Sequence, residues 1–90
     1  MDGFEWDPVK AAANLAKHQV DFADAALSLE DPKAHTVQDP DSTGEERFVT
    51  LAVDPQGTVL VTAYAHVAEN CRIISSRKAS PSERKRYEKL

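Results

Sequence analysis

Positive side chains gather in the last nineteen residues of this chain. Arg72–Leu90 holds seven Lys and Arg against two Asp and Glu, a net +5, whereas Met1–Cys71 holds four against thirteen, a net −9. Within the basic end, Arg72 and Arg77 bound the segment "RIISSR", and Lys78 follows. Guanidinium groups bind phosphate oxygens through paired hydrogen bonds, and oriented donors stabilise charge that develops on a phosphate. The basic end therefore indicates contact with a polyanion, and the acidic remainder indicates a surface for a basic partner.

The predicted strand Cys71–Arg77 decides whether these two arginines can act together. Residues 72 and 77 are an odd number apart, so a regular strand points their side chains to opposite faces of its sheet. They share a site only if a β-bulge intervenes or if one of them lies where the strand unravels. Tyr64 and His66 occupy polar positions of the preceding predicted strand. Arginines, a tyrosine and a histidine around a sheet suit phosphate binding and charge stabilisation.

A short basic helix is predicted at the C-terminal end. Ser80 to Glu83 reads Ser-Pro-Ser-Glu, a capping box with proline at the first helical position. A basic terminal helix is most often only a solvated surface, in which Glu83 pairs with Arg86 or Tyr87 for about 0.2–0.5 kcal/mol each. Composition alone therefore does not identify a nuclease. The side chains that could instead follow a nucleic-acid backbone, with salt-sensitive binding, are Arg84, Lys85, Arg86 and Lys89.

Residues that hold metals or act as nucleophiles are sparse. His35 and His66 are isolated and have no partner at metal-ligand spacing, and His18 suits the carbonyl end of a helix. The single cysteine, Cys71, excludes an internal disulfide and gives no zinc signature. The serines of "IISSR" lack the Gly-x-Ser-x-Gly context of a nucleophile. We therefore expect no metal ion and no cofactor.

The first third of the chain predicts one short strand and two helices. "FEWD" predicts a short strand or an extended lead-in, and Asp7 caps a helix over Pro8–Lys17 with proline in its first position. Asp21 caps a second helix, which Asp31-Pro32 ends. Apolar residues at helical spacing are Val9, Ala12, Ala13 and Ala16 in the first helix, and Phe22, Ala25, Ala26 and Leu29, a core-facing stripe, in the second.

The rest of the chain changes to strand periodicity. "AHTVQD" predicts a short strand, "DPDSTGEE" a polar loop, and Asp54–Gly57 a turn between two long strands. In the second long strand, five apolar residues alternate with Leu60, Thr62, Tyr64 and His66, which makes one face nearly all apolar. The predicted long strands are Arg47–Val53, Val59–Val67 and Cys71–Arg77.

This order of elements predicts an α+β fold. We expect an antiparallel sheet of about four strands, with two N-terminal helices packed on it and a short C-terminal helix. Residues 1–90 should form a single small domain, which buries roughly 60–65% of its unfolded surface. No apolar run approaches the roughly 20 residues of a membrane span, and the acidic N-terminus is unlike a signal peptide. We therefore expect a cytoplasmic protein with no membrane contact.

Two blocks of sequence are specific enough to suggest a family. From Phe4 the chain reads F-x-W-D-x-x-K-x-x-x-N-x-x-K-H, and from Arg72 it reads R-I-I-S-x-R-x-A-x-x-x-E-R-x-x-Y. With "GEERF" between them, these blocks resemble the BrnT family of bacterial toxins from Phe4 to about Glu88. The resemblance implies a RelE-like fold, metal-independent endoribonuclease activity and growth arrest. It also implies a BrnA-type ribbon-helix-helix antitoxin, through which alone promoter DNA would be bound.

The resemblance also implies roles for individual residues. The nucleophile would be the 2′-hydroxyl of the RNA itself, so the protein need only position the phosphate, move protons and stabilise charge. Glu46 would be the base or an orienting carboxylate, and Arg72 and Arg77 would clamp the phosphate. Tyr87 would supply a proton or stack on a base. The predicted RNA-binding positions are Lys10, Arg47, Lys78, Arg84 and Arg86.

Two positions depart from the family pattern. Val67 stands where an arginine usually precedes a tight turn, and loss of one well-placed donor costs about 3–4 kcal/mol of transition-state stabilisation. Gln19 stands where glycine is common at a helix end. Val67 and the formal net charge of −4 keep a second interpretation open, a catalytically weak or inactive toxin-like corepressor that binds the antitoxin. A third is a small RNA- or DNA-binding module unrelated to toxins.

Overall fold

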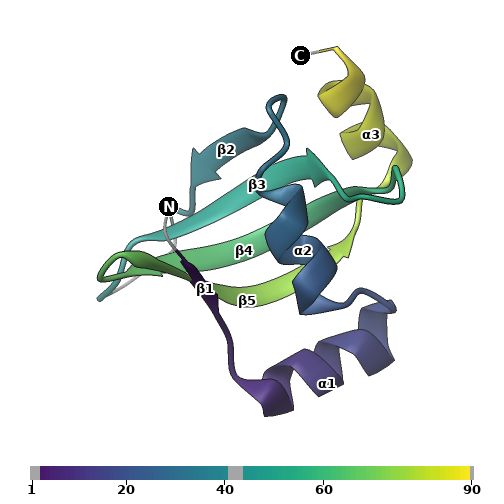
Figure 1. The fold of residues 1–90 in the computed structure, drawn as a ribbon. Helices are drawn as coiled ribbons and strands as arrows, with labels where there is room; N and C mark the ends of the chain where they lie inside the picture. Colours follow the sequence, from purple (N-terminus) through teal and green to yellow (C-terminus); the bar gives the residue numbers. More distant parts are fainter. Residues whose placement is uncertain (1–2, 41–43, 90) are drawn as a thin grey trace.

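The computed structural model describes residues 3–40 and 44–89, which form one five-stranded sheet and three helices (Figure 1). The sheet order is β1-β5-β4-β3-β2, and the predicted α+β class is confirmed. The strands are β1 Gly3–Glu5, β2 His35–Gln38, β3 Arg47–Val53, β4 Val59–Val67 and β5 Asn70–Lys78, and the helices are α1 Pro8–His18, α2 Phe22–Ser28 and α3 Pro81–Glu88.

The sheet differs from the prediction in one edge strand. We expected about four antiparallel strands, but the described residues form five, and Gly3–Glu5 pairs in parallel with Asn70–Arg72 of β5. The other neighbouring strands are antiparallel. A strand of three residues has no readable period, and its partner lies near the other end of the chain. The sequence could therefore show that "FEWD" is extended but not where it pairs.

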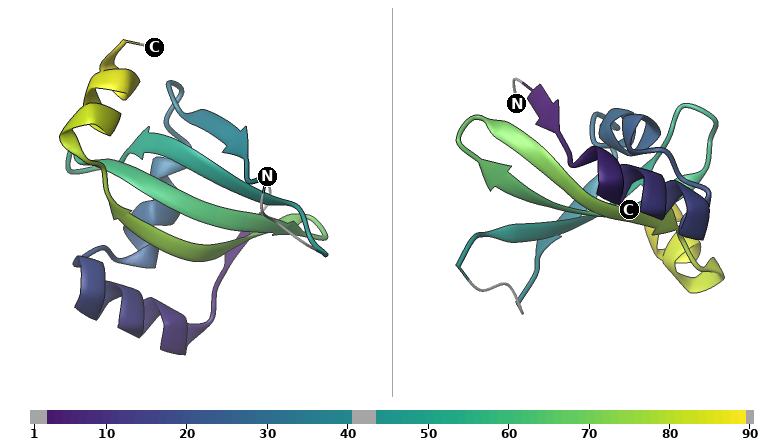
Figure 2. Two further views of the ribbon diagram at one scale, coloured as in Figure 1. Left: turned by 180° about the vertical axis from the view of Figure 1, so that it is seen from behind. Right: turned by 90° about the horizontal axis from the view of Figure 1, so that it is seen from below.

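The helices α1 and α2 cover one face of the sheet (Figure 2, right). Both begin at the predicted caps, because the side chains of Asp7 and Asp21 accept hydrogen bonds from the backbone N–H groups of Val9 (2.8 Å) and Ala23 (2.9 Å). Phe22 is fully buried at the centre of the core beneath α2. The core-facing stripe predicted for the second helix is therefore confirmed.

The apolar stripe of α1 faces solvent. Val9 remains 77% exposed, and the buried side chain of this helix is the polar Asn14. Its Nδ2 donates to the carbonyl oxygens of Val20 (3.1 Å) and Ser76 (2.8 Å), and its Oδ1 accepts from the Ser76 N–H (3.1 Å). A buried amide is stable when it is matched in this way. The helix packs on the sheet through the polar Asn14 rather than through its apolar stripe, so the spacing predicts the helix but not its buried face.

On β4, the helices cover the face that carries Leu60, Thr62 and Tyr64. Cross-strand hydrogen bonds satisfy the buried hydroxyls: Thr62 and Ser76 are 2.9 Å apart, and Thr50 donates to Tyr64 at 3.2 Å. This is not the face that the alternation marks as more apolar. The apolar side of β4 is left for the opposite surface of the sheet.

The helix α3 covers one end of that opposite surface (Figure 2, left). The predicted capping box is confirmed, since Ser80 Oγ accepts from the Glu83 N–H (3.3 Å) and Glu83 Oε1 accepts from the Ser80 N–H (2.8 Å). Ala79 donates its N–H to the Val59 carbonyl at 2.9 Å and, with Leu51, forms a small buried cluster there. The part of this surface that no helix covers is called the open face below.

Candidate active site

A β-bulge in β5 brings Arg72 and Arg77 to the same side of the sheet. The pairing between β4 and β5 skips one residue, Ile74, between two consecutive pairs. Beyond the bulge the alternation of β5 is shifted by one, so both arginines lie on the open face together with Ser75. The sequence left this question open, and the structure answers it.

Arg47, Arg72 and Glu45 form a cluster at one end of the open face, which we call the Arg47–Arg72 cluster. Ala65 of β4 pairs with both arginines, one on each neighbouring strand, so they flank a small side chain. Glu45 Oε1 lies 2.5 Å from Arg72 Nη2 and 3.5 Å from Arg47 Nε. The three side chains are between 31% and 45% exposed, so a phosphate can reach the guanidinium groups.

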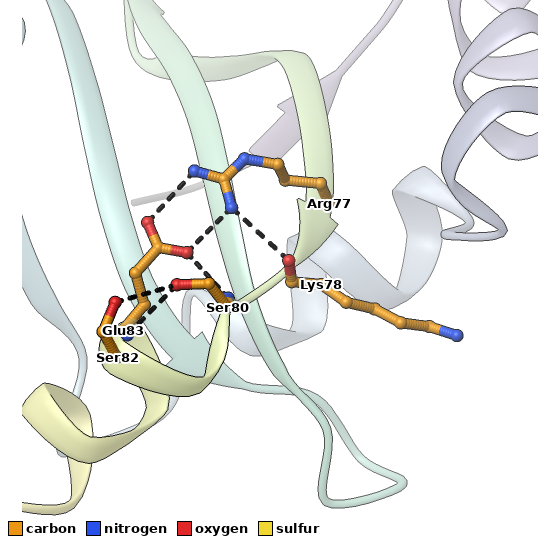
Figure 3. A network of polar contacts seen from close by, with 5 residues as sticks. All are labelled: Arg77, Lys78, Ser80, Ser82 and Glu83. Carbon is orange, nitrogen blue, oxygen red and sulfur yellow. Dashed lines mark hydrogen bonds and ion pairs between the residues drawn. The ribbon is translucent and has the colours of Figure 1, made fainter.

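Arg77 lies at the α3 end of the open face and pairs with Glu83 (Figure 3). Its Nη1 donates to Glu83 Oε1 at 2.8 Å and its Nη2 donates to Oε2 at 3.0 Å. The hydrogen bond from Arg77, with that from the Ser80 N–H, lowers the pKa of Glu83 to about 2. The same hydrogen bond raises the pKa of Arg77. Glu83 takes the Nη1/Nη2 edge of the guanidinium, so the Nε/Nη2 edge remains for another acceptor.

The two arginines lie on one face but do not converge on one point. Arg72 pairs with Ala65 and Arg77 with Val61, four residues apart on β4, or about 13 Å at about 3.3 Å per residue. A hollow of about 440 Å³ lies beside Arg77. A chain with several phosphates, rather than a single phosphate, would therefore reach both arginines. The residues that line this hollow are Lys17, His18, Val49, Val61, Ala63, Ser75, Ser76 and Arg77.

The carboxylate that contacts Arg47 and Arg72 is Glu45. Glu46, the predicted base, is exposed, and its side chain has no hydrogen bond or ion pair within the described residues. Glu45 instead contacts both Arg47 and Arg72. Glu45 lies in a bend before β3, so strand alternation could not single it out from Glu46 in the sequence. Glu45 is therefore the carboxylate that the structure places against Arg47 and Arg72.

Among the described residues, the hydroxyl of Tyr87 bonds to a carboxylate and not to a site arginine. It donates a short hydrogen bond to Asp31 Oδ2, which also accepts from the Val53 N–H at 3.0 Å. Burial and this contact raise the pKa of Tyr87 to about 12. Burial alone would raise the pKa of Asp31, but the hydrogen bonds from Tyr87, Val53 and Lys33 outweigh it and lower that pKa. In this structure Tyr87 anchors α3 to the loop after α2.

Tyr64 and His66 do not accompany the arginines, contrary to the grouping suggested by the sequence. Tyr64 is buried on the helix-covered side, where its ring stacks on Phe48 at 5.7 Å between centroids. His66 lies 4.8 Å from the same Phe48 ring. The bulge lies in β5, so it changes the face to which later side chains of β5 point. It does not change the faces to which the side chains of β4 point. The two strands therefore present these groups on opposite sides of the sheet.

The remaining predicted RNA-binding residues are exposed but dispersed. Lys10 is on α1, on the helix-covered side of the sheet. Lys78 points away from Arg77, as expected for neighbours in a strand (Figure 3). Arg84 and Arg86 project from α3, and Arg86 lines a hollow against the sheet. The structure therefore brings Arg47, Arg72, Arg77 and Arg86 to one side of the molecule.

Val67 also belongs to the open face. It lies two residues after Ala65 in β4, so it points to the same side as the Arg47–Arg72 cluster. It pairs with Asn70 across a two-residue turn in which Ala68 has φ 56°. An arginine at position 67 would extend the cluster, which has no third guanidinium among the described residues.

The described residues show neither a metal site nor a membrane helix. Between residues 3–40 and 44–89, no three His, Cys, Asp or Glu side chains gather as a metal site requires. In the same part of the chain, no helix is long and apolar enough to cross a membrane. Burial raises the pKa of Cys71 to about 11, so this thiol is neutral and a poor nucleophile at neutral pH.

An open sheet face with several arginines, next to a basic helix, has the charge that contact with a nucleic-acid chain requires. Residues 6–83 match the family described as "Ribonuclease toxin, BrnT, of type II toxin-antitoxin system". The chain therefore belongs to the BrnT family of ribonuclease toxins of type II toxin–antitoxin systems. The match ends within α3, so Arg84, Arg86 and Tyr87 lie beyond it.

The fold is similar to that of a solved member of this family. The crystal structure of the ribonuclease toxin BrnT of Brucella abortus aligns with a TM-score of 0.69 and 25% sequence identity. The alignment covers 89% of this chain and 99% of that chain. No curated protein matches the chain in sequence. The family suggested by the two sequence blocks is thus confirmed.

Proposed function

We propose that this chain is a metal-independent endoribonuclease that cleaves RNA on the open face of its sheet. The observation that carries the proposal is the β5 bulge, which places Arg72 and Arg77 on one exposed surface. With Arg47, these side chains offer guanidinium groups at two points about 13 Å apart along β4. An extended RNA strand can contact both points, and its backbone would then cross the hollow between them.

The reaction needs no nucleophile from the protein. The 2′-oxygen of a ribose attacks the adjacent phosphorus, the bond from phosphorus to the 5′-oxygen breaks, and a 2′,3′-cyclic phosphate and a 5′-hydroxyl form. A base takes the proton from the 2′-hydroxyl, and the 5′-oxygen takes a proton from solvent. We place the reacting phosphate at the Arg47–Arg72 cluster, because two guanidinium groups there can stabilise the added negative charge.

We assign the remaining roles to Glu45 and Glu46. Glu46 is exposed and without a side-chain partner in the described part of the chain, so it is the candidate base. Glu45 accepts a hydrogen bond from Arg72 and forms an ion pair with Arg47, so it is a positioning residue. Glu46→Gln should lower kcat. Glu45→Gln should mainly raise KM, because the arginines lose their fixed orientation.

We further propose a partner and a cellular effect. RNA cleavage in the cytoplasm would arrest growth, and a BrnA-type ribbon-helix-helix antitoxin would bind the toxin and link it to promoter DNA. The acidic segment Met1–Cys71, net −9, supports a basic partner of this kind. Co-expression of a neighbouring gene for a small basic protein should restore growth and co-purify with the toxin.

The central test is RNA cleavage in the presence of excess chelator. The natural chain should cleave a defined RNA, and Arg72→Ala should reduce the rate about 10²–10³-fold. Lys33→Ala is the matched control, since it removes one positive charge from an exposed loop residue outside the open face. Full activity in Arg72→Ala, or cleavage that requires an added metal ion, would refute the proposal.

The open-face position of Val67 favours one alternative, a weak or inactive toxin that acts as a corepressor. Val67→Arg separates the two, because it adds the guanidinium that the cluster lacks. Cleavage by the natural chain supports the enzyme. No cleavage by the natural chain, with cleavage gained in Val67→Arg, supports the corepressor.

A further inference from the structure

A second hollow, which we call the α3 groove, lies between α3 and the sheet. Its volume is about 120 Å³. Four apolar side chains from three strands make its floor, and three polar side chains surround it. The floor residues are Val37, Val49, Leu51 and Val61, and the surrounding residues are His35, Glu83 and Arg86.

The α3 groove has the size and chemistry for one flat aromatic ring. An enclosed apolar cavity of about 150 Å³ binds benzene, and the α3 groove, at about 120 Å³, is of the same order of size. The apolar floor favours a ring face, and the polar side chains can meet a ring edge that carries hydrogen-bonding groups. A nucleobase combines these two properties, since it has an apolar face and a polar edge.

The groove lies next to Arg77. Val49 and Val61 line both the α3 groove and the larger hollow beside Arg77. Glu83 forms part of the groove wall and also holds Arg77 through two hydrogen bonds of 2.8 and 3.0 Å. The Nε/Nη2 edge of Arg77 remains available to a phosphate. A base in the groove and a phosphate on Arg77 can therefore belong to one nucleotide.

We propose that the α3 groove is a base-binding subsite for the RNA strand on the open face. One nucleobase inserts over Val61 while a neighbouring phosphate binds Arg77, and Arg86 contacts the edge or the ring of that base. The inference rests on the proposed RNA binding and adds the place where a base is read.

Charge decides between a nucleobase and an antitoxin side chain as the occupant. Arg86 lines the groove, and Arg77 lies next to it in an ion pair with Glu83. That pair sums to zero, so the three side chains leave one net positive charge, that of Arg86. A basic antitoxin segment would meet unfavourable charge here, whereas the phosphates that flank a base would meet favourable charge. Antitoxin binding to this groove remains an outcome that the experiment can detect.

The experiment uses an RNA oligonucleotide with 2′-O-methyl groups, which binds but cannot be cleaved through its 2′-oxygen. Single abasic positions are introduced along it, and the affinity for the full chain is measured by fluorescence anisotropy. One position should weaken binding about fivefold to a hundredfold, because one stacked base is lost. The other positions should change affinity by less than about twofold.

Two matched pairs of variants locate the effect. Arg86→Gln and Arg84→Gln each remove one charge from α3, so both should weaken binding. Only Arg86→Gln should flatten the abasic profile, which is the dependence of affinity on the position of the abasic site. Val37→Asn and Val9→Asn each alter a valine exposed by half or more, 52% and 77%, and only Val37→Asn should flatten it. Thermal melting of each variant reports whether it remains folded.

The outcomes separate this inference from the proposed function. If the natural chain neither binds nor cleaves RNA, both fail. If it cleaves RNA but no abasic position matters, or if the sensitive position survives in Arg86→Gln and Val37→Asn, only the base-binding subsite is overturned. If these two variants lose antitoxin affinity and keep the abasic profile, the groove is a protein-docking site, and the inference is wrong.

Discussion

At the residue scale, Gln19 has a positive φ, a backbone conformation in which glycine would be more stable. Gln19 ends α1 with φ 56° and ψ 34°, and its N–H donates to the Leu15 carbonyl at 2.9 Å. A residue with a Cβ is strained in this left-handed conformation, whereas glycine is not. We therefore expect Gln19→Gly to raise the free energy of unfolding by up to about 1 kcal/mol. Urea denaturation measures this, and Gln19→Ala, which retains a Cβ, should gain nothing. An equal gain in both variants would assign the effect to the glutamine side chain.

Glu83 should make stability depend on pH in acid. Its folded pKa of about 2 lies below its ordinary value of about 4.5, because Arg77 and the Ser80 N–H bind the charged form. A lowered pKa contributes stability that is present above the ordinary value and is lost as the pH falls toward 2. Glu83→Gln should therefore cost about 1 kcal/mol at pH 7 and less at pH 3.

Unfolding by urea at both pH values checks this difference. Glu88→Gln is the control on the same helix, since Glu88 is exposed and has no side-chain hydrogen bond or ion pair among the described residues. A cost in Glu83→Gln that is the same at pH 3 and pH 7 would show that the carboxylate charge is not responsible.

At the scale of elements, Asn14 joins α1 to the sheet. Its amide makes three hydrogen bonds to the backbones of Val20 and Ser76, and none of these atoms is reached easily by water. Asn14→Ala leaves buried N–H and C=O groups unmatched, so we expect a loss of about 3 kcal/mol in the free energy of unfolding. Leu15→Ala, at a 48% exposed position of the same helix, should cost less than about 1 kcal/mol. Equal losses would mean that α1 is held by apolar packing instead.

Elements whose signals are local could be predicted from the sequence. The strands Arg47–Val53 and Val59–Val67 have the predicted ends, because period-2 alternation and the turn between them act within a few residues. The bulge at Ile74 and the parallel pairing of Gly3–Glu5 depend on contacts between distant segments, and nothing local encodes them. The same holds for the candidate site. The sequence predicted its arginines, but the face of the sheet on which they lie depends on the bulge.

At the scale of the whole molecule, charge segregation matters more than net charge. The formal net charge is −4, which taken as an average would oppose RNA binding. The open face nevertheless carries Arg47, Arg72 and Arg77 within reach of solvent, on a chain whose acidic residues are concentrated before position 72. Local potential, rather than net charge, governs the approach of a polyanion.

Salt dependence tests this directly. Each phosphate contact with a single strand contributes about −0.7 to the slope of log K against log[salt], where K is the association constant for RNA. If the three arginines each contact one phosphate, the slope should therefore be about −2. Arg77→Gln should reduce the magnitude of that slope by about 0.7, whereas Lys33→Gln, with the same change in net charge, should leave it unaltered. Affinities of a non-cleavable RNA between low and physiological salt give both slopes. If the two variants change the slope equally, net charge controls binding, and the open face is not the RNA surface.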